Sequence, residues 1–384
     1  MTEPRRIAYL TGSRADFGLM TPVLEAIERH PDLSLVIYIA GEHLSEAHGQ
    51  THREVAKLFP NAKVLDARIA GDTHEHHARF TSRLHHELTE ALVVERPDAL
   101  LLLGDRPEML TGALTATYLR IPIVHLHGGD LSTSVDNAVR FAISRLAHLH
   151  LPATEAAAKR LLSSGEHKSR VQAVGAPAID RIMHTPFPSR AELFSRLRLD
   201  PMSEVVLVTQ HPATESAEVA EREMQIVLAA VERFKKTAVV IHPHLDPGGS
   251  RMLSIIKTYA NRPEFCLIPS LPFVDFLALA RESVAWVGNS SAGMIESASL
   301  KVPVVNVGSR QDGRERGENV VDVPIDADAI LAALHFVTSD PVFRAKLAEL
   351  VSPWGDGRTG PRVADILAQA DFSDLVHKRF TFPV

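Results

Sequence analysis

Small and hydroxylated residues follow an apolar segment in the stretch Gly288–Arg316. The apolar segment Val284–Gly288 predicts a buried strand, and the residues after it have helical spacing. Small residues at such a strand-to-helix turn let backbone N–H groups approach phosphate oxygens. Glu296 falls within the predicted helix, where its carboxylate can accept hydrogen bonds from the two vicinal hydroxyls of a ribose. The pattern predicts a nucleotide-sugar site, and an ordinary strand–loop–helix with a serine N-cap is the alternative.

Charged residues also follow predicted strands in the first half of the chain. Arg14, in the motif TGSRADFG, is a candidate phosphate contact, whereas Asp16 in the same motif is suited to capping the next helix. Asp105 stands at the carboxyl end of a predicted strand, where cleft residues of parallel sheets lie. A cap for the helix that begins near Pro107 is an equally good interpretation of Asp105.

The segment after the next predicted strand concentrates polar side chains. These are His127, Asp130, Asp136 and Arg140. Asp136 and Arg140 are four residues apart, so they share one face if the segment is helical, and a surface ion pair is the simple alternative.

Histidines follow predicted strands in the second half. His211, His242 and His244 are candidates there, because several such residues converge on one predicted cleft. The histidine-rich segment Thr73–Phe80 has neither HExxH nor a Cys/His framework, so we interpret it as a polar helix start and expect no metal site.

The composition narrows the class of protein. Of 384 residues, 45% are hydrophobic and 23% charged, which is ordinary for a globular enzyme. The net charge of -6 argues against nucleic-acid binding. No apolar run reaches the roughly 18–20 residues of a membrane span, and the N-terminus lacks a signal-peptide pattern. The single cysteine, Cys266, excludes an internal disulfide and fits a cytoplasmic location.

Strand-like apolar runs alternate with helix-length segments along the chain, which predicts parallel sheets covered on both faces. About five runs precede Pro186 and five follow Pro201. We interpret the proline-containing segment between them as a linker between two doubly wound, Rossmann-like α/β domains with a central cleft. The expected boundaries are 1–185, 186–365 and a tail, 366–384, able to pack back on the first domain.

The chain resembles the hydrolysing UDP-N-acetylglucosamine 2-epimerases of sialic-acid and related nonulosonic-acid biosynthesis over nearly its whole length. The resemblance rests on the Asp136–Arg140 pair and on six ordered motifs: TGSRADFG, GDRPEM, HLHGGD, QHPATES, VGNSSAGMIE and GSRQDGRERGENVVDV. It implies the two-domain GT-B arrangement and conversion of UDP-GlcNAc to N-acetylmannosamine and UDP, without a metal or nicotinamide cofactor. We also expect a homo-oligomer, a dimer or a tetramer.

The resemblance assigns roles on the nucleotide side. It implies that Glu296 binds the ribose. The remaining implied UDP contacts are Ser290, Ser291 and Gly293 at the diphosphate, Arg14 and His211 near the phosphates, and Arg310 and Arg314 at the nucleotide end, with His242 as a further candidate.

On the sugar side, Asp105 and Asp136 match the family's catalytic carboxylates. His127 stands where animal members and non-hydrolysing relatives have Glu, which leaves the second proton-transfer group open among His127, Asp130 and Glu108. Arg140 completes the catalytic set. Family members often have His in the next position, which is Phe141 here.

The chemistry of such a reaction explains these residue types. No carbonyl flanks C2 of the sugar, so the C2 proton can be lost only as UDP departs from C1. Cations and backbone amides stabilise the negative charge that grows on the departing UDP. Hydration of the resulting 2-acetamidoglucal returns a proton to the opposite face, so two proton-transfer groups are required. Three alternatives stay open: the same reaction on a UDP-2,4-diacetamido-2,4,6-trideoxyhexose, used towards legionaminic-type acids, a GT-B glycosyltransferase, and a non-enzymatic sensor.

Overall fold

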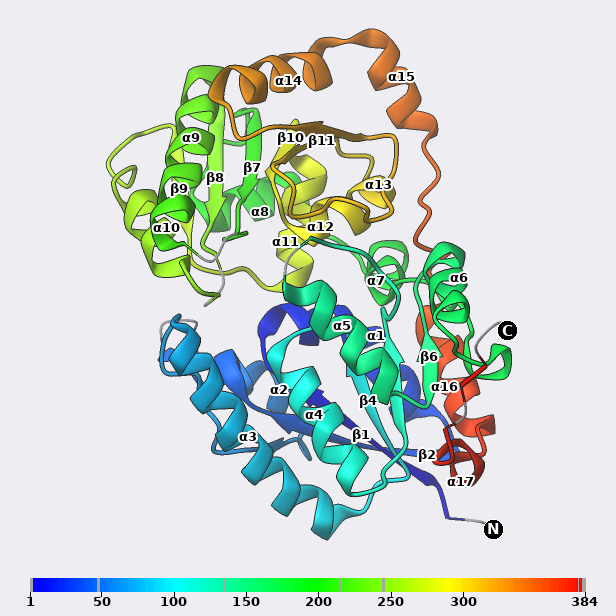
Figure 1. The fold of residues 1–384 in the computed structure, drawn as a ribbon. Helices are drawn as coiled ribbons and strands as arrows, with labels where there is room; N and C mark the ends of the chain where they lie inside the picture. Colours follow the sequence, from blue (N-terminus) through cyan, green and yellow to red (C-terminus); the bar gives the residue numbers. More distant parts are fainter. Residues whose placement is uncertain are drawn as a thin grey trace.

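The molecule has two six-stranded parallel sheets, one in each half of the chain (Figure 1). The computed structural model describes residues 3–46, 49–133, 135–213, 216–243, 246–378 and 380–381. The strand orders are β3-β2-β1-β4-β5-β6 and β12-β11-β10-β7-β8-β9, which is the same doubly wound order in each half. The predicted α/β fold, two Rossmann-like domains in the GT-B arrangement, is confirmed.

The strands are short and mostly apolar. The first sheet consists of β1 (Arg5–Thr11), β2 (Leu33–Ile39), β3 (Lys63–Val64), β4 (Ala99–Leu103), β5 (Ile123–Leu126) and β6 (Leu149–Leu151). The second consists of β7 (Val205–Thr209), β8 (Thr237–Ile241), β9 (Phe265–Ile268), β10 (Ala285–Gly288), β11 (Val304–Val307) and β12 (Val320–Val323). The sequence pattern misses β3 and β12, because β3 is only two exposed residues long and neither edge strand is fully buried.

Helices cover both faces of each sheet. The first half contains α1 (Arg14–Arg29), η1 (Gly41–Leu44), α2 (His52–Leu58), α3 (His74–Glu95), α4 (Pro107–Tyr118), α5 (Val135–Leu146), α6 (Glu155–Ser163), η3 (Lys168–Arg170) and α7 (Pro177–His184). The second half contains α8 (Arg190–Leu197), α9 (Ala217–Phe234), α10 (Gly249–Lys257), α11 (Phe273–Glu282), α12 (Ser291–Ile295), α13 (Ser297–Leu300), α14 (Ala327–Ser339) and α15 (Pro341–Glu349). The chain ends with α16 (Thr359–Gln369) and α17 (Phe372–Leu375). Within the described ranges, no helix has the length and apolarity needed to cross a bilayer.

Two helix starts follow the expected capping chemistry. Ser13 caps α1 in a capping box with Asp16, whose Oδ1 accepts hydrogen bonds from the Ser13 N–H at 2.7 Å and the Ser13 hydroxyl at 2.9 Å. Thr73 caps α3, so the histidine-rich segment is a helix start, as predicted. We find no cluster of three metal-ligating side chains in the part of the chain that the structure describes.

The helix expected after β10 is interrupted at Glu296, which separates α12 from α13. The Ser297 hydroxyl donates to the Gly293 carbonyl oxygen at 2.5 Å. Back-bonding of this kind competes with the backbone ladder and bends helices.

The segment interpreted as a linker contains α8. Its Leu193 and Phe194 are fully buried in the core beneath the second sheet, and α8 packs against α11. This segment therefore folds as part of the second half.

The polypeptide passes between the halves twice, at residues 185–189 and 350–358. After the second crossing, α16 packs against α1 of the first half (Figure 1, red helix). Both ends of α7, which precedes the first crossing, bond to the second crossing: the Ala176 N–H donates to the Trp354 carbonyl oxygen at 2.7 Å, and His184 Nε2 lies 2.8 Å from the Gly357 carbonyl oxygen. The expected boundary between residues 365 and 366 falls inside α16.

Candidate active site

Loops at the carboxyl ends of strands from both halves enclose two adjoining cavities of about 200 Å³ each. We call one the Asp105 cavity, after the polar residue that follows β4, and the other the Phe276 cavity, after an aromatic residue of α11. Ser290, Ser291, Glu296 and His211 line both cavities. The two cavities therefore form one continuous cleft between the sheets.

Asp105 is held at the mouth of the first sheet. Gly104 adopts a φ of 72°, which turns the chain sharply after β4, and Arg106 occupies the N-cap position of α4. Asp105 does not cap that helix. Its carboxylate instead accepts a hydrogen bond from the buried guanidinium of Arg140, so the cavity carries an oriented, ion-paired carboxylate.

Arg140 and Asp136 do not pair with each other, although both belong to α5. Arg140 bonds to Asp105 and also donates to the Asp130 carbonyl oxygen at 3.0 Å. Burial, followed by the nearby Arg314 and Arg310, lowers the pKa of the Arg140 guanidinium. Asp136 lies 3.4 Å from Arg310 of the second half. In place of the predicted Asp136–Arg140 pair there are thus two ion pairs, Arg140–Asp105 and Asp136–Arg310, and the second spans the cleft.

His127 and Asp130 form a bonded pair in the loop after β5. His127 Nδ1 lies 3.0 Å from Asp130 Oδ2, and both residues line the Asp105 cavity. Asp130 Oδ1 is buried with no partner in the described part of the molecule. His127 has a φ of 58°, a left-handed conformation that is uncommon for a residue with a side chain. Such strain persists where surrounding contacts hold it, and it is often found at functional sites.

Glu296 is a buried carboxyl with an unsatisfied oxygen. It is 2% exposed, and its Oε2 has no hydrogen-bond partner among the residues that the structure describes. Burial raises the pKa of this carboxyl to about 8, against a smaller opposing effect of Arg314. A buried polar atom left unpaired is costly unless a ligand or water satisfies it. Glu296 therefore has the properties of a hydrogen-bond acceptor awaiting a ligand.

Segments from the two halves contact each other beside the Asp105 cavity. The Thr133 hydroxyl donates to the Ser309 carbonyl oxygen at 2.6 Å, and Arg314 Nε donates to the Leu131 carbonyl oxygen at 3.2 Å. Arg160 of α6 also forms an ion pair with Glu315. These contacts join the loop after β5 to the loop after β11 and close one side of the cleft.

The sequence model of the UDP-N-acetylglucosamine 2-epimerase family matches residues 25–368. A Legionella pneumophila protein named UDP-N,N'-diacetylbacillosamine 2-epimerase (hydrolyzing) is 38% identical over 367 residues, which cover 94% of this chain and 95% of that protein. The chain belongs to the hydrolysing UDP-sugar 2-epimerase family.

The chain is also similar to a second named relative and to a solved structure. A Neisseria meningitidis serogroup B protein named UDP-N-acetylglucosamine 2-epimerase is 32% identical, covering 97% of this chain and 99% of its own. The crystal structure of Methanocaldococcus jannaschii UDP-GlcNAc 2-epimerase in complex with UDP-GlcNAc and UDP has a TM-score of 0.79 and covers 95% of this chain and 100% of its own, at 20% identity. At that identity the likeness concerns the fold alone.

Two residues expected at the site of this epimerase lie behind it. Glu108 is fully buried, bonds to Arg106 at 3.3 Å and lines neither cavity. Burial raises the pKa of the Glu108 carboxyl, and Arg106 opposes that shift. Gly293 faces the sheet, because a Cβ there would lie 3.4 Å from Val304 Cγ1, and its N–H donates to the Ser290 carbonyl oxygen at 3.1 Å. Their assigned roles stay predictions.

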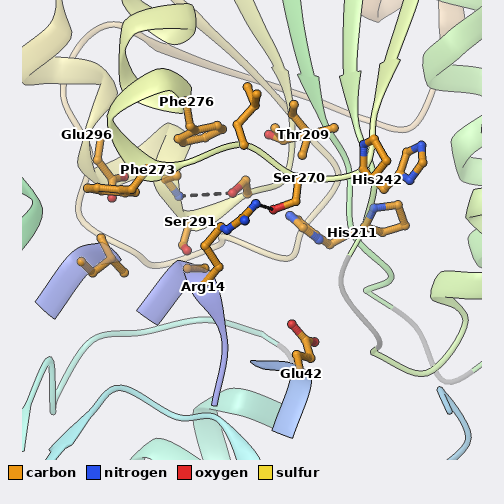
Figure 2. A pocket seen from close by; sticks show the side chains of 18 of the residues that line it. Arg14, Glu42, Thr209, His211, His242, Ser270, Phe273, Phe276, Ser291 and Glu296 are labelled. Carbon is orange, nitrogen blue, oxygen red and sulfur yellow. Dashed lines mark hydrogen bonds between the residues drawn. The ribbon is translucent and has the colours of Figure 1, made fainter. Parts of the chain in front are cut away.

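The remaining predicted residues lie in the cleft. Arg14 reaches across it and donates to the Ser270 hydroxyl at 2.8 Å (Figure 2). His211 is fixed through its backbone, whose N–H donates to Asn289 Oδ1 at 2.8 Å. His242 lines the Phe276 cavity, while His244 lies outside the described residues.

Sequence reasoning missed the apolar wall of the epimerase's Phe276 cavity. Leu271, Phe273 and Phe276 line it, together with Pro269, after β9 (Figure 2). Flat apolar walls of this kind suit a planar base. The signal was present in the run SLPF directly after a predicted strand, but apolar residues there are equally typical of core.

Proposed function

We propose that the enzyme eliminates UDP from a UDP-2-acetamido sugar and hydrates the resulting 2-acetamidoglucal to the 2-epimeric free sugar. One observation carries the proposal. The carboxylates Asp105 and Asp136 line the same cavity as Ser290, Ser291 and Glu296. A leaving-group site and proton-transfer groups within one cleft are what the reaction requires. A glycosyltransferase removes no proton from C2, so it would not need these carboxylates for that step.

On the nucleotide side, the uracil occupies the Phe276 cavity and the ribose hydroxyls donate to Glu296. Ser290 and Ser291 contact the diphosphate, with Gly293 contributing to the turn. Further contacts to the nucleotide come from Arg14, His211, His242, Arg310 and Arg314. Cationic and hydroxyl groups at this end stabilise UDP as the C1–O bond breaks and its electron pair moves to the phosphate oxygen.

On the sugar side, one carboxylate of Asp105 and Asp136 takes the C2 proton while the C1–C2 double bond forms. Arg140 orients the Asp105 carboxylate in the cavity, which suits it to the general-base role. Water then adds its oxygen to C1, and a proton reaches C2 from the opposite face. We assign that second transfer to the His127–Asp130 pair in preference to Glu108, because the pair lines the cavity and Glu108 does not.

We propose UDP-N,N'-diacetylbacillosamine, a UDP-2,4-diacetamido-2,4,6-trideoxyhexose, as the substrate to test first. The support is the higher identity to the Legionella protein of that name, 38% against 32% for the Neisseria UDP-GlcNAc 2-epimerase. UDP-GlcNAc, which the sequence motifs favour, is the second candidate. Either product belongs to nonulosonic-acid synthesis, of the legionaminic or the sialic type.

We further propose a division of labour between the halves. Residues 1–185 provide the sugar-facing carboxylates, residues 186–365 bind UDP, and residues 366–384 pack back on the first domain. Assembly into a dimer or tetramer and a cytoplasmic location stay predictions, which light scattering and cell fractionation test.

The direct test is incubation of the purified enzyme with each UDP-sugar in deuterated water, without added cofactor. We expect release of UDP and a 2-epimerised sugar carrying deuterium at C2. The faster substrate identifies the natural one. Product without deuterium at C2 would rule out the elimination mechanism, and no UDP release from either sugar would overturn the proposed function.

A further inference from the structure

Trp354 is a buried tryptophan placed where the chain returns from the second half to the first. It lies between α15 and α16, in the crossing segment drawn in orange to the right of Figure 1. It is fully buried, although neither cavity of the cleft is lined by it. Its contacts reach both sides of the cleft.

One face of the indole packs against His127. The ring centroids are 6.1 Å apart and the planes differ by 25°, an offset stack. His127 is the residue whose backbone is held at a φ of 58°. The orientation of its imidazole is therefore set by two contacts, Asp130 Oδ2 at 3.0 Å and the Trp354 ring.

The indole N–H points to the other half of the molecule. Nε1 donates to the Met294 carbonyl oxygen at 3.0 Å. Met294 belongs to α12, which begins at Ser291 and leads directly into Glu296. One rigid ring thus touches both the loop of the His127–Asp130 pair and the short helix at the nucleotide side.

The backbone of Trp354 leaves the ring little freedom to move. Its carbonyl oxygen accepts the Ala176 N–H at 2.7 Å. Next to it, Gly355 has a φ of 118°, and a Cβ there would lie 3.0 Å from Gly175 Cα. The two chain segments approach so closely that only glycine fits between them. A displacement of α12 would therefore act on the indole ring through its N–H bond to Met294, while the backbone of Trp354 stays in place.

We propose that Trp354 is a positioning residue that orients the His127 imidazole and couples its orientation to occupation of the UDP site. The inference rests on the proposed function, because it needs UDP at α12 and proton transfer at His127. Misplacing a proton-transfer group by about 1 Å can cost about 100-fold in rate. A contact that fixes the imidazole therefore has a large effect on turnover and little on nucleotide affinity.

A spectroscopic experiment tests the coupling without turnover. The chain has two tryptophans, so Trp286→Phe leaves Trp354 as the sole indole fluorophore. We expect UDP to change the emission of this variant saturably. Adding His127→Ala should also change the emission of the unliganded protein. If neither UDP nor His127→Ala changes the Trp354 emission, the coupling is overturned, whatever the activity of the enzyme.

A kinetic experiment tests the positioning role. Trp354→Phe keeps a ring on His127 but loses the N–H, and Trp354→Leu loses both. We expect kcat to fall about threefold in Trp354→Phe and at least about tenfold in Trp354→Leu. In both variants the Kd for UDP should stay within about twofold of wild type. Phe194→Leu, a fully buried aromatic of the same core without contact to His127, is the matched control. It should lower Tm without changing kcat per folded enzyme.

A double-mutant cycle completes the test. In a His127→Ala background, Trp354→Leu should cause no further loss of kcat, because the tryptophan acts through the histidine. Additive losses, an effect equal to that of Phe194→Leu, or a wild-type kcat for His127→Ala would each overturn the proposal. A wild-type enzyme that releases no UDP would instead refute the proposed function, and the emission experiment would still decide the coupling.

Discussion

The two halves of the molecule share one strand order but present different chemistry at the shared edge. In the first half, the groups at the strand ends are charged and already paired, as in Asp105 with Arg140 and His127 with Asp130. In the second half, Ser290 and Ser291 offer hydroxyls, and Glu296 keeps a buried, unpaired oxygen. One half is therefore preorganised for proton transfer, while the other is incomplete until a ligand binds.

The largest loss of turnover is expected at the carboxylates of the first half. Of Asp105→Asn and Asp136→Asn, the variant that removes the general base for the C2 proton should lower turnover by at least about 100-fold. UDP affinity should stay within about threefold, since these side chains belong to the other half. UDP-release kinetics and calorimetry with UDP measure the two effects.

Asp66→Asn is the matched control for these variants, because Asp66 is an exposed carboxylate paired with Arg83 in the same half. It should behave as wild type. Wild-type rates in both Asp105→Asn and Asp136→Asn would refute the assignment.

The second half should respond in the opposite way. Glu296→Gln should weaken UDP binding by about tenfold or more, because a charge-assisted hydrogen bond contributes about 1.5–3 kcal/mol. The kcat at saturating substrate should fall far less than in the aspartate variants. Calorimetry with UDP tests the first effect, and saturation kinetics test the second.

Glu223→Gln is the control for Glu296, because Glu223 of α9 is also buried, with an unpaired Oε2 and a pKa raised by burial. It lies outside both cavities. UDP affinity reduced equally in both variants would show that the loss is not specific to the site.

UDP affinity should depend on pH through the ionisation of Glu296. The pKa of Glu296 is about 8 without ligand, and ribose hydroxyls donate best to the ionised form. UDP affinity should therefore rise with pH towards 8, by up to about tenfold per unit, and level off above it. Measurements from pH 7 to 9 avoid the phosphate titration near about pH 6. A profile in Glu296→Gln as steep as in wild type would contradict this origin.

The stability of the unliganded enzyme should change with pH in the direction opposite to that of UDP affinity. The folded-state pKa of Glu296 lies above its ordinary value of 4.5. Between these values the folded carboxyl keeps its proton while the unfolded one has lost it. The free energy of unfolding therefore decreases as pH rises towards 8, by up to about 1.4 kcal/mol per pH unit. Urea unfolding of wild type and Glu296→Gln at several pH values measures the difference.

The smallest effect is expected where the halves touch. Arg160→Ala removes the ion pair with Glu315 and a hydrogen bond to the Gly129 carbonyl oxygen at 2.6 Å. Because such partly exposed pairs contribute about 1 kcal/mol or less, KM should rise about two- to fivefold. Arg79→Ala, which removes an exposed pair with Glu75 within α3, should leave KM unchanged. Equal values for both variants would show that the cross-half contact plays no part in substrate binding.

The sequence predicts those parts of the molecule that depend on neighbours along the chain. Continuous apolar runs predict ten of the buried strands, and Asp105, His127 and Ser290 are found because each follows such a run. The pairing of Asp136 with Arg310 is invisible to spacing, because it joins residues from opposite halves. Phe276 and Trp354 look like ordinary core residues, since an apolar side chain gives no sign of what it faces. Glu108 and Gly293 match motifs but face inward, because motifs do not specify the direction of a side chain.

The paired crossings of the chain limit how the cleft can open. A single connecting segment would let one half swivel freely about the other. Here the chain passes between the halves at residues 185–189 and again at 350–358, and both ends of α7, just before the first passage, bond to the second at Ala176–Trp354 and His184–Gly357. Two neighbouring connecting segments allow the halves to rotate relative to each other essentially about one axis only. We therefore expect the halves to move mainly by opening and closing over the substrate, so that each closure brings the same groups face to face.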